Sequence, residues 1–187
     1  MASAFTHAFA AIAGGKIFAD RKMPLRFWIL AVLCSVLPDF DAAGYALGIP
    51  YESFWGHRGF THSLVFALIV GLLVVLLFFR SEASSGKRWW GLVIFFFLVT
   101  ASHPLLDMLT NGGHGVAILS PFDNERYFFP WHPIKVSPIG ITSFFTERGM
   151  SVILSEMLYV WVPLLLVLLI VLAVRKSPKN LNRQKDM

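Results

Sequence analysis

Three long uncharged apolar runs constrain the fold of this chain most strongly. They cover residues 63–79, 89–106 and 157–174, and each approaches the roughly 20 residues that a helix needs to cross a bilayer. Two shorter apolar runs, residues 2–15 and 27–38, precede them. The chain is 56% hydrophobic and only 14% charged, whereas soluble proteins carry about 25% charged residues. The sequence therefore predicts an all-α, polytopic membrane bundle of about five segments, the first two of them short.

The connections between these runs differ in charge. Residues 16–26, 80–88 and 175–187 hold 12 of the 16 Lys and Arg residues. Because basic loops tend to stay in the cytoplasm, we expect these three connections on the cytoplasmic side and the N-terminus outside. Residues 1–174 then form one membrane domain, and 175–187 form a basic cytoplasmic tail. The net charge of +5 follows from these loops, so no nucleic acid is expected as a partner.

This topology gathers metal-binding residue types on one side of the membrane. It places all six histidines and eight of the 11 acidic residues outside, or at the outer end of a helix. Imidazole and carboxylate groups are the ligands that zinc and similar divalent ions take in proteins. An acidic, histidine-rich outer face therefore suits a divalent-metal site.

Two pairs of residues could supply ligands. His103 and Asp107 are four positions apart, so on a helix they share one face and can offer a nitrogen and an oxygen to one ion. The alternative is a helix-end histidine that bonds its own carboxylate neighbour. Asp39 and Asp41 follow Pro38, which we expect to end or kink the preceding helix. The two carboxylates then flank one ion, divide into a ligand and a general base, or lie in a solvated turn.

The sequence GHRGFTHS occupies residues 56–63, directly before the third apolar run. His57 and His62 are five positions apart, so they converge only if His57 lies on the loop and Thr61 or His62 begins the helix. Glycine permits such a turn, and Thr61 is a suitable N-cap. Arg58 suits bidentate contact with a phosphate or carboxylate, or a salt bridge to one of the two aspartates.

Four further residues are weaker candidates. His7 gains interest from topology, because it lies at the outer end where the others gather. The connection from residue 107 to 151 is long, and such loops are often functional. Within it His114 is a candidate ligand and Arg126 a candidate metal or substrate contact. Glu156 is expected to face either the site or a basic partner.

Several of these motifs together resemble a known family. They are Thr6-His7, Leu37-Pro38-Asp39-Phe40-Asp41, HRGFTHS at residues 57–63, and Ser102-His103-Pro104-Leu105-Leu106-Asp107. In these motifs, and along nearly the whole chain up to Val174, the sequence is similar to the bacterial membrane-bound metal-dependent hydrolases. That family includes LexA-regulated inner-membrane members. The resemblance implies a metal-dependent hydrolase in the bacterial inner membrane.

The order of the motifs is also distantly similar to zinc-dependent phospholipase C and the P1-type nucleases. Those helical enzymes hydrolyse phosphoesters with clustered zinc ions. Carried over, this resemblance implies zinc ligands at His7, Asp39, His57 or His62, His103 and Asp107, with His114 a further candidate. Those enzymes also use an N-terminal tryptophan amine, whereas residue 1 here is Met. The resemblance therefore implies one or two ions rather than three.

The sequence thus predicts a membrane-bound zinc hydrolase that acts on a phosphoester, lipid-linked by preference, at the outer face of the inner membrane. Asp39 or Asp41 would take a proton from the attacking water, and Arg58 would hold the scissile anionic group. Membrane lipids are the expected partners, and the oligomeric state stays open. The alternative from another class is a non-catalytic membrane protein that binds a divalent ion for transport or structure.

Overall fold

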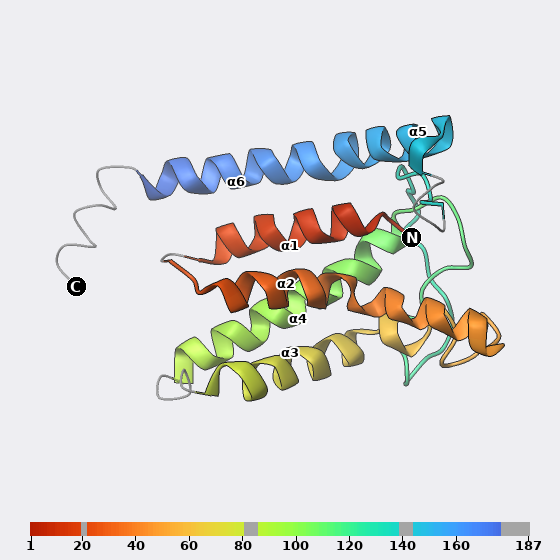
Figure 1. Ribbon diagram of the computed structural model, residues 1–187, viewed down its shortest axis with the longest axis horizontal. Helices are drawn as coiled ribbons and strands as arrows, with labels where there is room; N and C mark the ends of the chain where they lie inside the picture. Colours follow the sequence, from red (N-terminus) through yellow and green to blue (C-terminus); the bar gives the residue numbers. More distant parts are fainter. Residues whose placement is uncertain (20–21, 81–85, 139–143, 177–187) are drawn as a thin grey trace.

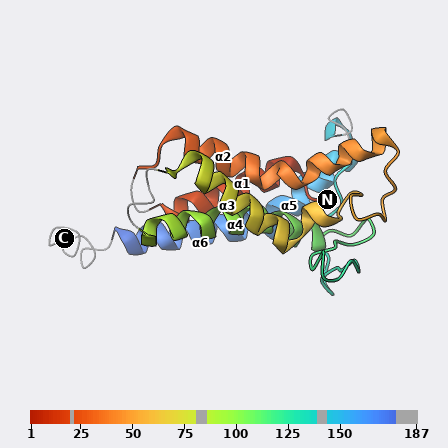
Figure 2. The same cartoon turned by 90° about the horizontal axis from the view of Figure 1, so that it is seen from below.

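The computed structural model describes residues 1–19, 22–80, 86–138 and 144–176, which form an antiparallel bundle of helices (Figure 1). The elements are α1 (Ala4–Phe18), α2 (Leu25–Val36), 3-10 helix η1 (Leu37–Leu47), 3-10 helix η2 (Phe60–His62), α3 (Leu64–Phe78), α4 (Gly86–Met108), α5 (Glu147–Glu156), π-helical η5 (Met157–Trp161) and α6 (Val162–Arg175). Because the bundle is antiparallel, α1 begins at the end opposite to the one where α6 ends (Figures 1 and 2). The predicted all-α membrane class is confirmed, and the described ranges contain no regular strand.

Three helical stretches in the described ranges are long and apolar enough to cross a membrane: Leu25–Leu47, Gly86–Met108 and Glu147–Arg175. Helices α1 and α3 have 15 residues each. The first segment is therefore short, as predicted. The α-helix of the second segment is also short, with 12 residues in α2, but η1 continues it, and the helical stretch covers 23 residues. Pro38 stands near the start of η1, where its missing N–H costs little. Asp39 and Asp41 consequently lie on a helix and not in a turn.

The last helical stretch contains Pro163, at which the sequence predicts a kink. Proline removes one backbone N–H, and its ring presses on the carbonyl four residues earlier. The chain accommodates this with the π-helical turn of η5 immediately before α6, because local π geometry re-satisfies the backbone groups that proline leaves unpaired. The helical stretch therefore continues to Arg175.

Aromatic and small residues form the core between α2, α3 and α4. The ring centroids of Phe27 and Phe95 are 4.6 Å apart, and Phe96 lies edge-on to Phe27 at 5.7 Å. Gly71 allows α3 to approach α4, since a Cβ atom there would lie 2.9 Å from the backbone nitrogen of Phe97. Small residues make such contacts between membrane helices. Helix α6, by contrast, contributes no buried residue, so its apolar surface suits lipid.

Polar contacts tie α1 to the last helical stretch at both ends. Arg175 donates to three carbonyls at the end of α1 and in its C-cap. At the opposite end, Glu156 is fully buried and accepts from the backbone N–H and hydroxyl of Ser3 and from the hydroxyl of Thr6. A carboxylate at a helix N-terminus is favoured by the helix dipole. In the described residues Glu156 thus contacts no basic partner. It connects the end of α5 to the start of α1 instead.

Candidate metal centre

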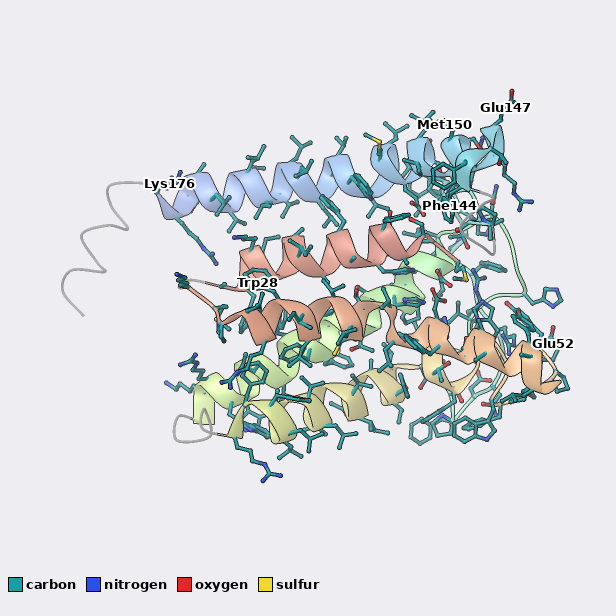
Figure 3. The ribbon with its side chains drawn as sticks, in the orientation of Figure 1. Trp28, Glu52, Phe144, Glu147, Met150 and Lys176 are labelled. Carbon is teal, nitrogen blue, oxygen red and sulfur yellow. The ribbon has the colours of Figure 1, made fainter. Side chains whose placement is uncertain are left out.

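Polar side chains from four segments converge at the end of the bundle where α1 begins and α4 ends. Glu52 and Glu147 mark this end in Figure 3, opposite Lys176. We refer to the converging residues as the His/Asp cluster: His7 of α1, Asp39 of η1, His62 of η2, and His103 and Asp107 of α4. Four of them are fully buried, and the side chain of Asp39 is 13% exposed.

The spacing of the cluster fits one ion. One ligand atom from each of Asp39, His62, His103 and Asp107 lies within 4.8 Å of the other three. Nε2 of His103 is 3.3 Å from Oδ1 of Asp39. Nε2 of His62 is 3.8 Å from that oxygen and 3.9 Å from Oδ2 of Asp107. Two ligands of a tetrahedral zinc ion with bonds near 2.0 Å are roughly 3.3 Å apart, so these atoms surround a space of suitable size.

The atoms that face this space lack hydrogen-bond partners. Nε2 of His7, His62 and His103, Oδ1 of Asp39 and Oδ2 of Asp107 are all buried without a hydrogen bond in the described structure. A buried polar group left unsatisfied costs about 1–3 kcal/mol, and native structures contain few of them. The four of these atoms that belong to Asp39, His62, His103 and Asp107 surround one space, so they are unfavourable by themselves, and a divalent ion would satisfy them together.

Hydrogen bonds on the far side of two histidines prepare them to bind metal. Nδ1 of His103 is 2.7 Å from the carbonyl oxygen of Ser35. Because a carbonyl only accepts, Nδ1 carries the hydrogen, and Nε2 of the neutral ring presents its lone pair. Nδ1 of His62 is 3.1 Å from Oδ2 of Asp41, with the same consequence. Metal-binding histidines are typically oriented in this way by a carbonyl or carboxylate.

His7 lies beside the group of four. Its ring stacks on His103 with centroids 3.7 Å apart and planes at 14°. Its Nε2 is 3.6 Å from Oδ1 of Asp107, and neither of its nitrogens has a hydrogen-bond partner in the described residues. His7 thus lies at the cluster, next to the ligand atoms of α4, as its place at the outer end of the first segment predicted.

Asp41 acts as a hydrogen-bond acceptor for its whole neighbourhood. Its two oxygens are 2.6 Å from Nδ1 of His57 and 3.1 Å from Nδ1 of His62, and they accept from the hydroxyl of Thr61 and the backbone N–H of Arg58. Asp41, His57 and His62 are close enough to hold a second ion. However, the facing atoms there already bond one another, so this group is better described as an orienting network.

The N-cap of α3, at the end of the loop that precedes it, differs from the predicted one. Ser63, and not Thr61, is the N-cap of α3, and its side chain accepts from the N–H of Phe66 at 3.0 Å. The hydroxyl of Thr61 is instead committed to Asp41, which removes it from the cap. Arg58 has φ = 64°, and a Cβ atom on Gly56 would lie 2.2 Å from the carbonyl oxygen of Tyr51. The tight loop thus depends on glycine, as predicted.

Arg58 is buried and points toward the cluster. Its Nε is 3.1 Å from Oδ2 of Asp107, close enough for an ion pair although the two atoms are not aligned for a hydrogen bond. Its terminal nitrogens donate to the carbonyl of Gly112 and the hydroxyl of Thr110. The salt bridge considered from sequence therefore forms with Asp107, and not with the carboxylates of η1. The role of Arg58 in holding a substrate anion stays a prediction.

Two weaker candidates lie outside the cluster. His114 is 67% exposed and pairs with Glu52. Arg126 donates to the carbonyls of His57 and Tyr51 at 2.9 and 2.7 Å and lies over the Tyr51 ring. Arg126 thus braces the loop that carries His57.

The family comparison agrees with this membrane architecture. The family model described as YdjM inner membrane protein matches residues 1–179. The chain belongs to this inner membrane protein family. The inner membrane protein YbcI of Escherichia coli (strain K12) is 38% identical over 163 residues, which cover 87% of this chain and 92% of that protein. No solved structure matches the chain.

These comparisons confirm the predicted inner-membrane location. The names of this family and of YbcI give a location and no activity, so the resemblance to hydrolases and phospholipase C receives no support from them. The side of the membrane on which each terminus lies stays a prediction, and residues 177–187 of the predicted tail lie outside the described residues.

Four other residues at the site were missed from the sequence: Ser35, Tyr45, Tyr51 and Thr110. The carbonyl of Ser35 and the hydroxyl of Thr110 meet cluster residues or their neighbours, but nothing in their spacing distinguishes them. Tyr45 and Tyr51 have ring centroids 5.8 and 5.6 Å from that of His57. Their place at the centre of a polar, glycine-containing connection was the signal that could have marked them.

The protonation of His62 gives a pH-dependent prediction for the metal-free protein. Burial lowers the pKa of His62, but the nearby carboxylates of Asp39 and Asp41 outweigh it and raise the pKa from 6.5 to about 9. The added stability is therefore fully present below pH 6.5 and is lost as the pH rises through 9. At 1.36 kcal/mol per pKa unit the loss is on the order of 3 kcal/mol.

This loss should appear in the free energy of unfolding of chelator-treated protein, measured in detergent across pH 6–9.5. In His62→Gln the same curve should be flatter by the His62 contribution. Curves that run parallel in the two proteins would contradict the assignment.

Proposed function

We propose that this protein is a metal-dependent hydrolase with one divalent ion, zinc, held by Asp39, His62, His103 and Asp107. The observation that carries the proposal is the set of buried, unpaired nitrogen and oxygen atoms that face one space. Two imidazoles and two carboxylates form a donor set typical of zinc in proteins. When bound, the ion supplies Lewis-acid activation of water and of a phosphoryl group.

Catalysis is favoured over a purely structural role because the cluster adjoins open space. Catalytic metal sites keep a position for water or substrate, whereas structural sites are closed. A cavity of about 450 Å³ is lined by His57 and Arg58, and Arg58 contacts Asp107 of the cluster. Asp39 has the most exposed side chain in the cluster, and its Oδ2 remains available when Oδ1 faces the ion. We assign it the task of accepting a proton from the attacking water.

A lipid-linked phosphoester at the outer face of the inner membrane is the substrate class that suits this position. Large aromatic side chains near this end are exposed, among them Phe40 (69%), Trp55 (60%) and Phe122 (87%). Exposed aromatics typically mark the membrane–water interface. Transporters, in contrast, place their ligands near the midplane in broken helices, whereas the ligands here stand at helix ends.

Metal content and hydrolysis measured on the same preparations test this proposal. Wild-type protein, purified in detergent without chelator, should contain about one zinc ion per chain and should hydrolyse at least one of a panel of lipid phosphoesters. His103→Gln removes one of four ligands, so both metal and hydrolysis should be lost. His114→Gln is the matched control, because His114 is exposed and outside the cluster, and it should retain both.

The outcomes separate the alternatives. Wild-type protein without metal sinks the metal centre and the hydrolase together. A full complement of metal with no turnover on any phosphoester supports the non-catalytic alternative. Equal metal loss in His103→Gln and His114→Gln would show that the ligands have been assigned to the wrong residues.

A further inference from the structure

The charged side chains that line the cavity beside the cluster are those of arginine residues. Its volume is about 450 Å³, and it opens at the loop end of the bundle. The polar and aromatic side chains that line it are Tyr45, Tyr51, His57, Arg58, Ser137 and Arg148. Two arginines are present, and no carboxylate lines the cavity among the described residues. The charged side chains that line the cavity are thus basic, and Arg58, which pairs with Asp107, connects the cavity to the cluster.

The two arginines differ in how far their charge is already neutralised. Arg58 is 1% exposed, pairs with Asp107, and donates to Gly112 and Thr110. Its guanidinium is therefore fixed by the protein. Arg148 of α5 is exposed, and in the described residues its guanidinium has neither a hydrogen bond nor an ion pair.

Arg148 also differs from the other outer cations. Arg126 pairs with Glu52 and donates to two backbone carbonyls, which fixes it against the loop. Lys135 is exposed on the same side but does not line the cavity. In the described structure Arg148 is thus the outer arginine that faces the cavity with its charge uncompensated.

We propose that this cavity binds a phosphate group of the substrate, and that Arg148 determines this specificity. The proposal rests on the proposed function and deepens it, because the cavity shares Arg58 with the metal centre. A guanidinium matches phosphate geometry with two parallel hydrogen bonds. The rings of Tyr45 and Tyr51 and the apolar side chains of Val136 and Pro138 form walls that suit the uncharged part of a phosphate ester.

The test compares Arg148→Gln with Arg148→Lys and with the control Lys135→Gln. Binding of inorganic phosphate and of dioctanoyl phosphatidic acid to the purified, metal-loaded proteins is measured by titration calorimetry. Loss of charge-assisted hydrogen bonds should raise the Kd in Arg148→Gln about tenfold or more. Arg148→Lys should recover part of the affinity, and Lys135→Gln should match the wild type.

The two probes distinguish the source of the phosphate. Tighter binding of phosphatidic acid than of inorganic phosphate, with the same dependence on Arg148, identifies a lipid headgroup. Equal binding identifies a free phosphate group as sufficient. If neither probe binds to the wild type, or if Arg148→Gln binds as tightly as the wild type, the assignment of the cavity is overturned.

Measurements of KM, kcat and metal content distinguish the role of Arg148 from the proposed hydrolase activity. Where wild-type protein hydrolyses a phosphoester, Arg148→Gln should raise KM and leave kcat and metal content near wild-type values. A fall in kcat with unchanged KM contradicts the specificity role while leaving the hydrolase intact. Phosphate binding that depends on Arg148, in protein that lacks metal and turnover, sinks only the hydrolase.

Discussion

Replacing Asp107 with asparagine should both empty the metal centre and destabilise the fold. Asp107 is fully buried, accepts from the backbone N–H of Ala2 at 2.7 Å, and lies 3.1 Å from Nε of Arg58. Asparagine removes the charge that compensates Arg58, and breaking a buried ion pair in this way typically costs about 3–5 kcal/mol. The free energy of unfolding in detergent and the zinc content should therefore fall together.

Asp39→Asn is the matched control for this effect. It removes a second cluster carboxylate, but Asp39 has no arginine partner in the described residues. Zinc should be lost from both variants, whereas only Asp107→Asn should lose several kcal/mol of stability. The double variant Arg58→Met/Asp107→Asn removes both charges and should regain much of that stability. Equal stability of the two single variants would contradict the role of the ion pair.

Much of the bundle could be predicted because membrane helices are long and uncharged. The run over residues 63–79 matches α3 to within one residue at each end. Because residues four positions apart share a helix face, the spacing of His103 and Asp107 placed both on one face of α4, and Pro104 lies inside that helix. The failures occurred where chain geometry competes with composition. Pro38 does mark the end of α2, as predicted, but the chain continues as a 3-10 helix and not as a turn. Ser63 caps α3 because Asp41 takes the hydroxyl of Thr61.

The sequence predicted which residues gather at the site better than it predicted the role of each one. Topology alone brought His7, His62, His103 and two aspartates to one end of the molecule. Residue type and spacing could not distinguish Asp39 from Asp41, since both follow Pro38 and carry the same group, and only the resemblance to zinc enzymes implied Asp39 as the ligand. Only the contacts show that Asp39 faces the cluster, whereas Asp41 bonds the histidines from behind. These contacts join residues 16 or more positions apart, and no local pattern encodes them.

Asp41→Asn should therefore weaken metal binding although Asp41 is not among the four ligands. Its carboxylate accepts from Nδ1 of both His57 and His62, which leaves Nε2 of His62 free for the ion. An asparagine amide can turn its NH₂ group toward Nδ1 of His62 and favour the tautomer whose Nε2 carries the hydrogen. Loss of such an orienting partner typically costs about 10–100-fold in metal affinity.

Competition with a zinc chelator of known affinity measures this change. Asp123→Asn is the matched control, because it makes the same change from carboxylate to amide at a residue that bonds Glu125 and Tyr127 and not the cluster, so its zinc affinity should stay close to that of the wild type. If Asp41 were itself a ligand, Asp41→Asn would lose zinc as completely as His103→Gln. An intermediate affinity is thus the result that separates orientation of His62 from direct coordination, and wild-type affinity in Asp41→Asn would contradict both roles.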